Sequence, residues 1–335
     1  MRHFVIVGIL VIVTAVLIYL GLNSIGLMPV EASVQAVSID WMWNWEVVAM
    51  SFLFSLIAVP MFYSMVVFRR RKGDTSDGEH IEGNTSLEIT WTILPLFAVI
   101  VFAYMGAKSL GDIRRVDPTA MVINVHAQQF TWTFEYPDYG FFSDELHLPV
   151  DKQVVLKMDS KDVIHSFWVP EFRVKQDVVP GRVTDYRITP SLIGDYKVRC
   201  AELCGTSHAY MQKPVIVSNQ AQFTSWVGEQ EAIAKEKGKT PEGQGQLLTV
   251  KNGCTGCHSL TSSPLPQAPA WFALFGSKVQ LADGTTVIAD DAYLTESIKT
   301  PKAKEVKGYS PSTMPQFVLT DEEIANIVAY IKTLK

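Results

Sequence analysis

The residues of this 335-residue chain that could bind a metal or a heme are its four cysteines and the histidines beside them. They form two groups: Cys200, Cys204 and His208, and then Cys254, Cys257 and His258. Four cysteines in a large exported chain could also form disulfides. A histidine close to each pair indicates metal or heme chemistry instead.

The first group lies in a short stretch, Cys200–Met211, that also holds Glu202 and His208. Thiolate, thioether and imidazole groups suit copper, and ligands so close in sequence can converge on one point. His165 would join them from a distant strand. A blue-copper site needs one cysteine, so the second allows two thiolates to bridge two copper ions. Zinc is an alternative, since it accepts two cysteines and two histidines, but Met211 would then have no role.

The second group reads C-T-G-C-H over residues 254–258, which is the C-x-x-C-H motif for attachment of c-type heme. Cys254 and Cys257 would form the thioethers and His258 would ligate the iron. Met314 follows 56 residues later (314 − 258) and could be the second axial ligand, which raises the reduction potential. The alternatives are a redox or zinc site for the cysteines and a core position for Met314.

Short β-rich runs between prolines and glycines surround the first group. They predict an all-β domain over residues 118–230, a small sandwich or barrel of the cupredoxin type. Residues 231–245 are rich in Glu, Lys, Gly and Gln and are typical of a linker or a partly helical hinge. Residues 246–335 are predicted to form an all-α domain, with its first helix near residues 245–250 and its last after Thr320.

Residues 1–110 are predicted to be a membrane anchor with helices at about 4–22, 47–68 and 89–107, each near the ~20 residues that cross a bilayer. Basic residues at 69–72 predict a cytoplasmic position for the loop between the second and third helices. Everything after about residue 108 is then expected to lie outside the cytoplasm. The first segment could instead be a signal peptide, but we expect it to be retained. With 48% hydrophobic and 19% charged residues, the chain is predicted to be a mixed membrane protein. A net charge of −5 without a long basic run argues against nucleic-acid binding.

These motifs resemble subunit II of cytochrome c oxidase with a class I cytochrome c fused behind it. The resemblance rests on His165-Ser166 with Val169-Pro170, on Pro180-Gly-Arg182, and on C-A-E-L-C-G-x-x-H-x-x-M from Cys200. It covers about residues 85–230 and reaches into the third apolar segment, where Leu87-Glu88-Ile-Thr-Trp91 is similar to the start of that family's last helix.

The resemblance implies a set of cofactor ligands. It implies that dinuclear copper (CuA) is bound by the side chains of His165, Cys200, Cys204, His208 and Met211 and by the backbone carbonyl of Glu202. The carboxylate of Glu202 would also reach a magnesium ion shared with subunit I. Heme c would be attached at Cys254 and Cys257, with His258 and Met314 on its iron.

The resemblance also implies roles for three other residues. Glu88 would lie at the mouth of a proton pathway; the alternative is a helix-start carboxylate favoured by the helix dipole. Phe130 takes the position of the family's usual electron-accepting tryptophan, which puts the usual docking of a diffusible cytochrome in doubt. Trp132 would assist electron transfer or pack in the core.

The expected function is electron input to a heme-copper terminal oxidase. Electrons would pass from an external donor through heme c to CuA and on to the heme of subunit I, where oxygen is reduced to water. The donor could be a soluble cytochrome, a copper protein or a docked quinol-oxidising complex. The expected partners are subunits I and III and membrane lipid, with no nucleic acid. The expected location is the bacterial plasma (inner) membrane, with the CuA and heme domains on its extracytoplasmic side.

Two alternatives remain open. One is the electron-input subunit of a CuA-containing nitric oxide reductase, which this chain cannot distinguish because the partner subunit determines the acceptor. The other is a membrane-tethered copper-binding or assembly protein. The chain has no histidine set for the oxygen-reducing centre, so it is not expected to be catalytic alone.

Overall fold

A computed structural model describes residues 1–78, 80–309 and 313–335. The chain divides into two compact units. The first comprises Met1–Glu31 and Gln35–Arg115, and the second comprises Ala32–Val34 and Val116–Lys335.

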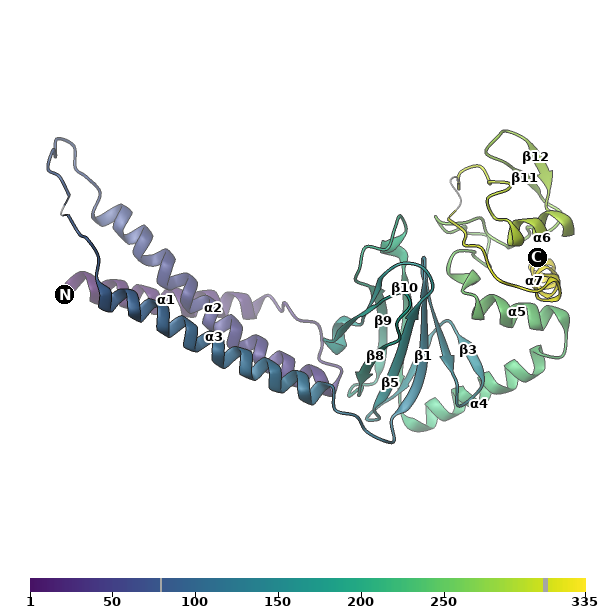
Figure 1. Cartoon of the computed structure of the whole chain (residues 1–335), viewed down its shortest axis with the longest axis horizontal. Coiled ribbons are helices and arrows are strands. Elements are labelled where there is room, and N and C mark those ends of the chain that lie inside the picture. Colours follow the sequence, from purple (N-terminus) through teal and green to yellow (C-terminus); the bar gives the residue numbers. More distant parts are fainter. Residues whose placement is uncertain (79, 310–312) are drawn as a thin grey trace. The chain divides into compact units, whose positions relative to one another are not determined.

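The first unit consists of three long helices, α1 (Arg2–Ser24), α2 (Val34–Val67) and α3 (Thr85–Ile113) (Figure 1). Each is long and apolar enough to cross a membrane, and almost none of their apolar surface is buried within the chain. Side-chain hydrogen bonds join His3 to Tyr63 between α1 and α2, at 2.7 Å, and Ser38 to Ser109 between α2 and α3, at 3.1 Å.

Two of these helices extend beyond their apolar runs. α2 begins at Val34, ahead of the expected start at residue 47, so it includes the tryptophans at 41, 43 and 45. α3 begins at Thr85 because the Asn84 side chain accepts a hydrogen bond from the Leu87 amide and caps the helix. Hydropathy marks the apolar core of a helix, whereas caps and polar turns decide where it ends.

The second unit begins with a sandwich of two five-stranded sheets. One sheet has the order β3-β2-β1-β5-β8, and the other has the order β4-β10-β9-β6-β7. The first sheet contains β1 (Met121–Gln128), β2 (Thr131–Tyr136), β3 (Phe141–Ser143), β5 (Val154–Ser160) and β8 (Thr184–Ile188). The second contains β4 (Leu146–Pro149), β6 (His165–Trp168), β7 (Lys175–Val178), β9 (Gly194–Cys200) and β10 (Gln212–Ser218).

Alternating burial along the strands builds the core of this sandwich. Along β1, for example, Met121, Ile123 and Val125 are buried and the residues between them are half-exposed, because successive side chains point to opposite faces. β6 pairs with β9, with Phe167 opposite Cys200, so the histidine of one strand lies near the cysteine that ends the other. The loop after β9 contains the short 3₁₀ helix η2 (His208–Tyr210), which leads into β10.

The rest of the second unit is mainly helical; Phe223 and Val227 in its first helix pack in the core of the sandwich, and the part from residue 241 onward has its own apolar core. Its helices are α4 (Gln220–Lys237), α5 (Pro241–Lys251), α6 (Asp291–Lys299) and α7 (Asp321–Thr333), with the 3₁₀ helix η3 (Cys254–Gly256) and a short hairpin of β11 (Lys278–Gln280) and β12 (Thr286–Ile288). α4 and α7 begin with full capping boxes at Asn219 and Thr320. The predicted combination of apolar N-terminal helices, an all-β domain and a C-terminal helical domain is confirmed.

The segment expected to be a linker or a partly helical hinge, residues 231–245, is largely helical. Residues 231–237 form the end of α4, and α5 already begins at Pro241, because Thr240 caps it and proline suits the first helical position. The expected linker of residues 231–245 is therefore reduced to a short turn, and the expected first helix near Gly245 begins four residues earlier (245 − 241).

Candidate copper and heme centres

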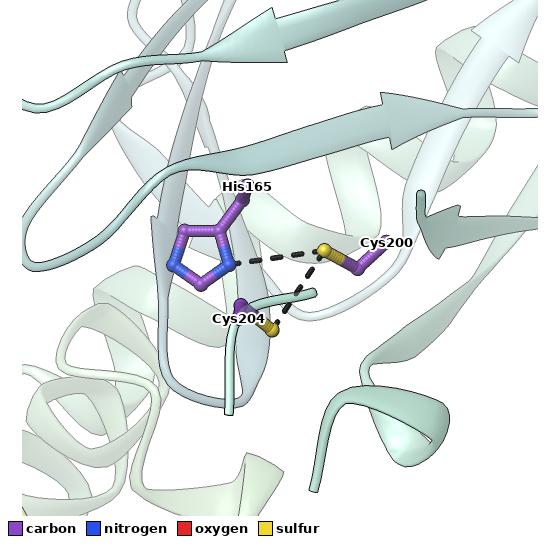
Figure 2. Close-up of side chains that lie close together, drawn as sticks. All are labelled: His165, Cys200 and Cys204. Carbon is purple, nitrogen blue, oxygen red and sulfur yellow. Dashed lines mark hydrogen bonds between the residues drawn. The ribbon is translucent and has the colours of Figure 1, made fainter. Parts of the chain in front are cut away.

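Three potential metal ligands meet at one end of the sandwich. His165 begins β6 and is fully buried, Cys200 ends β9, and Cys204 lies in the loop that follows. Their ligand atoms all lie within 4.8 Å of one another. The Cys200 Sγ is 3.8 Å from His165 Nδ1 and 3.8 Å from Cys204 Sγ (Figure 2). This buried group of one imidazole and two thiols is suited to a soft metal ion.

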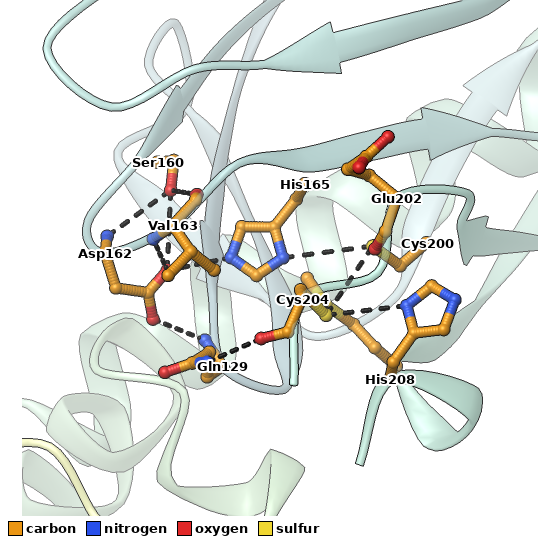
Figure 3. Close-up of polar contacts among 10 residues, drawn as sticks. Gln129, Ser160, Asp162, Val163, His165, Cys200, Glu202, Cys204 and His208 are labelled. Atoms are coloured by element: carbon orange, nitrogen blue, oxygen red, sulfur yellow. Dashed lines mark hydrogen bonds and ion pairs between the residues drawn. The ribbon is translucent and has the colours of Figure 1, made fainter. Parts of the chain in front are cut away.

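The other three predicted copper ligands reach the same point. The Cys204 Sγ lies 3.5 Å from His208 Nδ1 and 3.8 Å from Met211 Sδ. The backbone carbonyl of Glu202 lies 3.2 Å from Cys200 Sγ, whereas the Glu202 side chain is exposed (Figure 3). All six predicted donor groups therefore converge. The chain brings the Glu202 carbonyl to the cluster and leaves its carboxylate available to another ion.

The two thiols of the cluster differ in acidity. Burial opposes ionisation of Cys200, but hydrogen bonds with His165 and the Ser166 backbone outweigh it and lower the pKa of Cys200 to about 6. Burial and the Cys200 thiolate together raise the pKa of Cys204 to about 12. Burial alone would keep His165 neutral, but hydrogen bonds with Asp162 and Cys200 raise its pKa to about 8. Cys204 is therefore harder to ionise than Cys200, and a bound cation would favour the thiolate form of both.

This donor set fits dinuclear copper better than zinc. The two cysteine sulfurs lie 3.8 Å apart and each has a histidine Nδ1 within 3.8 Å, so together they would hold two copper ions. A single tetrahedral zinc ion would be complete with the two cysteines and two histidines and would leave the thioether of Met211 unused. The buried Met211 instead points its sulfur at Cys204.

Sequence reasoning missed two residues that hold the cluster in place. Asp162 accepts a hydrogen bond from His165 Nε2 at 2.8 Å, which leaves Nδ1 directed at Cys200. Gln129 donates its side-chain amide to the Cys204 carbonyl at 2.5 Å. The carboxylate three residues before His165 was the only available signal for Asp162, and Gln129 lies too far away in sequence to have given one.

His258 of the C-x-x-C-H motif lines a cavity in the helical domain. Cys254 and Cys257 lie in and directly after η3, at the end of α5. His258 donates Nδ1–H to the Pro269 carbonyl at 2.9 Å and stacks on Trp271 at 4.8 Å between ring centroids. Its Nε2 is then the free ligand atom, and burial lowers the pKa of His258, which keeps the imidazole neutral as an iron ligand must be.

Met314 lines the same cavity as His258. The other lining residues are mostly apolar and include Trp271, Leu294 and Ile298. A second cavity is bounded by Cys254, Cys257, His258 and Met314 together. An apolar space between a histidine and a methionine, with two cysteines at its edge, fits a covalently attached heme.

The remaining predicted site residues lie in different surroundings. Phe130 and Trp132 are both buried, and Trp132 packs edge-on against His165 and Phe167 with centroid distances of 6.1 and 5.5 Å. Glu88 is exposed in the first turn of α3, where its carboxylate accepts a hydrogen bond from the backbone N–H of Asn84 at 3.3 Å. That contact is the one expected of a carboxylate in the first turn of a helix.

Comparison with family profiles divides the chain in the same three-part way. Residues 20–109 match the transmembrane domain of cytochrome c oxidase subunit II, residues 142–220 match its periplasmic domain, and residues 243–335 match cytochrome c.

Curated relatives match over most of their length. Cytochrome c oxidase subunit 2 of a Synechocystis species is 33% identical over 65% of this chain and 79% of that protein. The subunit of Alkalihalophilus pseudofirmus is 30% identical over 84% of this chain and 83% of that protein. The subunit of Thermostichus vulcanus is 33% identical over 67% of this chain and 84% of that protein.

Proposed function

The chain belongs to the cytochrome c oxidase subunit II family, and from this we propose that it is the electron-input subunit of a heme-copper terminal oxidase. In this role it relays electrons from an external donor through heme c to dinuclear CuA and on to the heme of subunit I, where oxygen is reduced to water. The convergence of six copper-binding groups beside a fused C-x-x-C-H domain carries this proposal.

The proposed copper ligands are the side chains of His165, Cys200, Cys204, His208 and Met211 and the carbonyl of Glu202. Copper at this site and heme c at Cys254, Cys257, His258 and Met314 would each take up and release one electron at a time. The protein residues hold the two sites rigidly: β6 and β9 fix His165 and Cys200, and η3 fixes the heme cysteines. A fixed ligand set keeps the geometry change on electron transfer small. The exposed Glu202 carboxylate is proposed to bind magnesium at the contact with subunit I.

The partners follow from the family. We infer contacts with subunits I and III in the membrane, and a donor that is a soluble cytochrome, a copper protein or a docked quinol-oxidising complex. The fused heme domain replaces bimolecular docking at copper by an intramolecular step, because tethering raises its effective concentration there. Glu88, at the start of α3, is proposed to lie at the mouth of a proton pathway, and the membrane is proposed to be the bacterial plasma membrane.

The experiment is purification of the membrane complex through a tag on this chain, followed by chemical reduction of heme c under oxygen. Co-purification of a subunit with high-spin heme, together with oxygen consumption, supports the proposal. Reduction of nitric oxide without consumption of oxygen would assign the chain to a nitric oxide reductase instead. Recovery without any heme-bearing partner would favour a copper-binding or assembly protein.

A further inference from the structure

The turn between β1 and β2, residues 128–131, contacts the copper loop on one side. The Gln129 side chain donates to the Cys204 carbonyl at 2.5 Å, and its backbone N–H donates to Asp162 Oδ2 at 2.7 Å. The other oxygen of Asp162 accepts from His165 Nε2 at 2.8 Å. Gln129 is therefore hydrogen-bonded directly to one predicted copper ligand and through one carboxylate to another (Figure 3).

The same turn contacts the heme-attachment segment on its other side. Gln128 donates its side-chain amide to the Asn252 carbonyl at 2.6 Å. Burial raises the pKa of the Cys257 thiol, although the Phe130 backbone lies close enough to Cys257 to lower that pKa by a smaller amount. Gln128 and Phe130 are buried, with 6% and 4% of their surfaces exposed. The Gln128 side chain is therefore largely shielded from water where the two domains meet, whereas Gln129 and Phe130 also line a cavity that is open to solvent.

Three glycines allow this close approach. A Cβ on Gly205, in the copper loop, would lie 2.9 Å from Gln129 Nε2. A Cβ on Gly253 would lie 2.6 Å from Gln128 Nε2, and one on Gly256, inside the C-x-x-C-H motif, would overlap with Thr131. The copper loop and the heme loop thus each press their backbone against opposite sides of one four-residue turn.

We propose that this turn is the electron bridge between the two centres, with Gln129 as its positioning residue. The route runs from Cys257 through the Phe130 backbone to Gln129 and across its amide to the Cys204 carbonyl. One electron is transferred, heme c is oxidised and the copper centre is reduced, and no proton or atom moves. This inference rests on the proposed function, because it assumes that both cofactors are bound.

The bridge also determines which cofactor an external donor reduces. Phe130 is buried against the copper loop and the heme segment. A soluble donor therefore delivers its electron to heme c and not at position 130, where the family usually has its electron-accepting tryptophan.

The test is Gln129→Met in the purified oxidase complex. Methionine keeps the length of the side chain and removes the amide donor. Gln176→Met is the matched control, since Gln176 also donates its amide to a backbone carbonyl, that of Asp177 at 3.3 Å, but on β7 and outside the turn. The measurements are the rate at which photoreduced heme c passes its electron to copper, the copper electron paramagnetic resonance spectrum, and the copper and heme content.

The expected result is full copper and heme content in both variants, with electron transfer slowed about fivefold or more only in Gln129→Met. That factor corresponds to one net hydrogen bond of about 1 kcal/mol holding the coupled geometry. The copper hyperfine pattern should also change only in Gln129→Met, because the Cys204 carbonyl loses its donor. Gln129→Glu, which also lacks the amide donor, should behave in the same way.

Wild-type rates and spectra in both Gln129 variants would overturn the bridge while leaving the relay intact. Electron transfer could also be slowed only because both Gln129 variants lose copper or heme. That result would give Gln129 a purely structural role and would also overturn the bridge. If the wild-type complex holds both cofactors and no electron passes between them, the proposed function itself fails.

Discussion

Two of the predicted copper ligands, His165 and Cys204, are held by contacts on their outer side, and Asp162 makes the one to His165. It accepts from the far nitrogen of His165 and from the Gln129 backbone. A carboxylate in this position fixes both the tautomer and the ring orientation of a metal-binding histidine. Asp162 is also tied to its own loop, since it accepts from the Val163 amide at 2.7 Å. The imidazole is therefore oriented before copper binds.

Replacing Asp162 with asparagine should weaken copper binding by roughly 10- to 100-fold, the usual effect of losing such a partner. Copper competition against a chelator measures this. Asp159→Asn is the control, because Asp159 pairs with His126 at 2.6 Å away from the cluster, and it should bind copper like the wild type. Equal copper affinities in the two variants would show that Asp162 does not orient His165.

Met314 determines the reduction potential of the heme if it is the second axial ligand. A methionine ligand raises the potential relative to histidine. Met314→His should therefore keep the covalent heme and lower its midpoint potential by on the order of 0.1 V or more, within the ~0.8 V that axial ligands span. A redox titration of heme c measures the shift. Met158→Leu, in the core of the sandwich, should leave the potential unchanged, and an unchanged potential in Met314→His would remove Met314 from the iron.

At the scale of helices and strands, one glycine allows two helices of the cytochrome domain to cross closely. A Cβ on Gly245 in α5 would overlap with the backbone carbonyl of Asn326 in α7. The Asn326 side chain donates to Gln244 Oε1 at 2.8 Å, so the same crossing also carries a hydrogen bond. α5 leads directly into the heme-attachment motif, and its packing therefore positions the heme cysteines.

Gly245→Ala should destabilise the cytochrome domain by about 1–3 kcal/mol, because the added methyl group forces the two helices apart. Gly228→Ala is the matched control, since Gly228 lies in α4 with open space around it. That variant should be neutral or more stable by about 0.5–1 kcal/mol, as alanine is the better helix former. Thermal unfolding followed by heme absorbance compares them, and equal stability in the two variants would contradict the close crossing.

Local sequence predicts the copper cluster better than it predicts the contacts around it. Four of its six donors are side chains in one twelve-residue stretch, so their types and spacing indicated their convergence, whereas the Glu202 carbonyl was implied only by the family resemblance. Asp162 and Gln129 act through a loop and a turn brought close by strand pairing, and no local pattern encodes such pairing. The expected linker ends early because Thr240 caps α5 and Pro241 is its first residue. The overall composition of the segment did not indicate this local signal.

At the scale of the whole molecule, three apolar helices anchor two extracytoplasmic redox domains. The short basic run Arg69–Lys72 follows α2 and favours a cytoplasmic position for the α2–α3 loop. α3 then leaves the membrane on the opposite side, so all of the predicted copper and heme ligands lie outside the cytoplasm. That location suits attachment of c-type heme and contact with external electron donors.

The topology predicts the behaviour of reporter fusions. A reporter that is active only outside the cytoplasm should be inactive when fused after Asp77, in the α2–α3 loop, and active when fused after Pro118, beyond α3. Enzymatic assay of both fusions, with immunoblots to equalise expression, makes the measurement. Activity at Asp77 or its absence at Pro118 would reverse the orientation.

The most direct test of the electron-relay proposal is metal and heme analysis of the purified chain together with low-temperature electron paramagnetic resonance. The relay predicts two coppers for each covalent heme and a copper signal in which one unpaired electron is shared by both ions. One copper, zinc in place of copper, or a signal localised on a single ion would contradict the dinuclear site and with it the proposed path from heme c to subunit I.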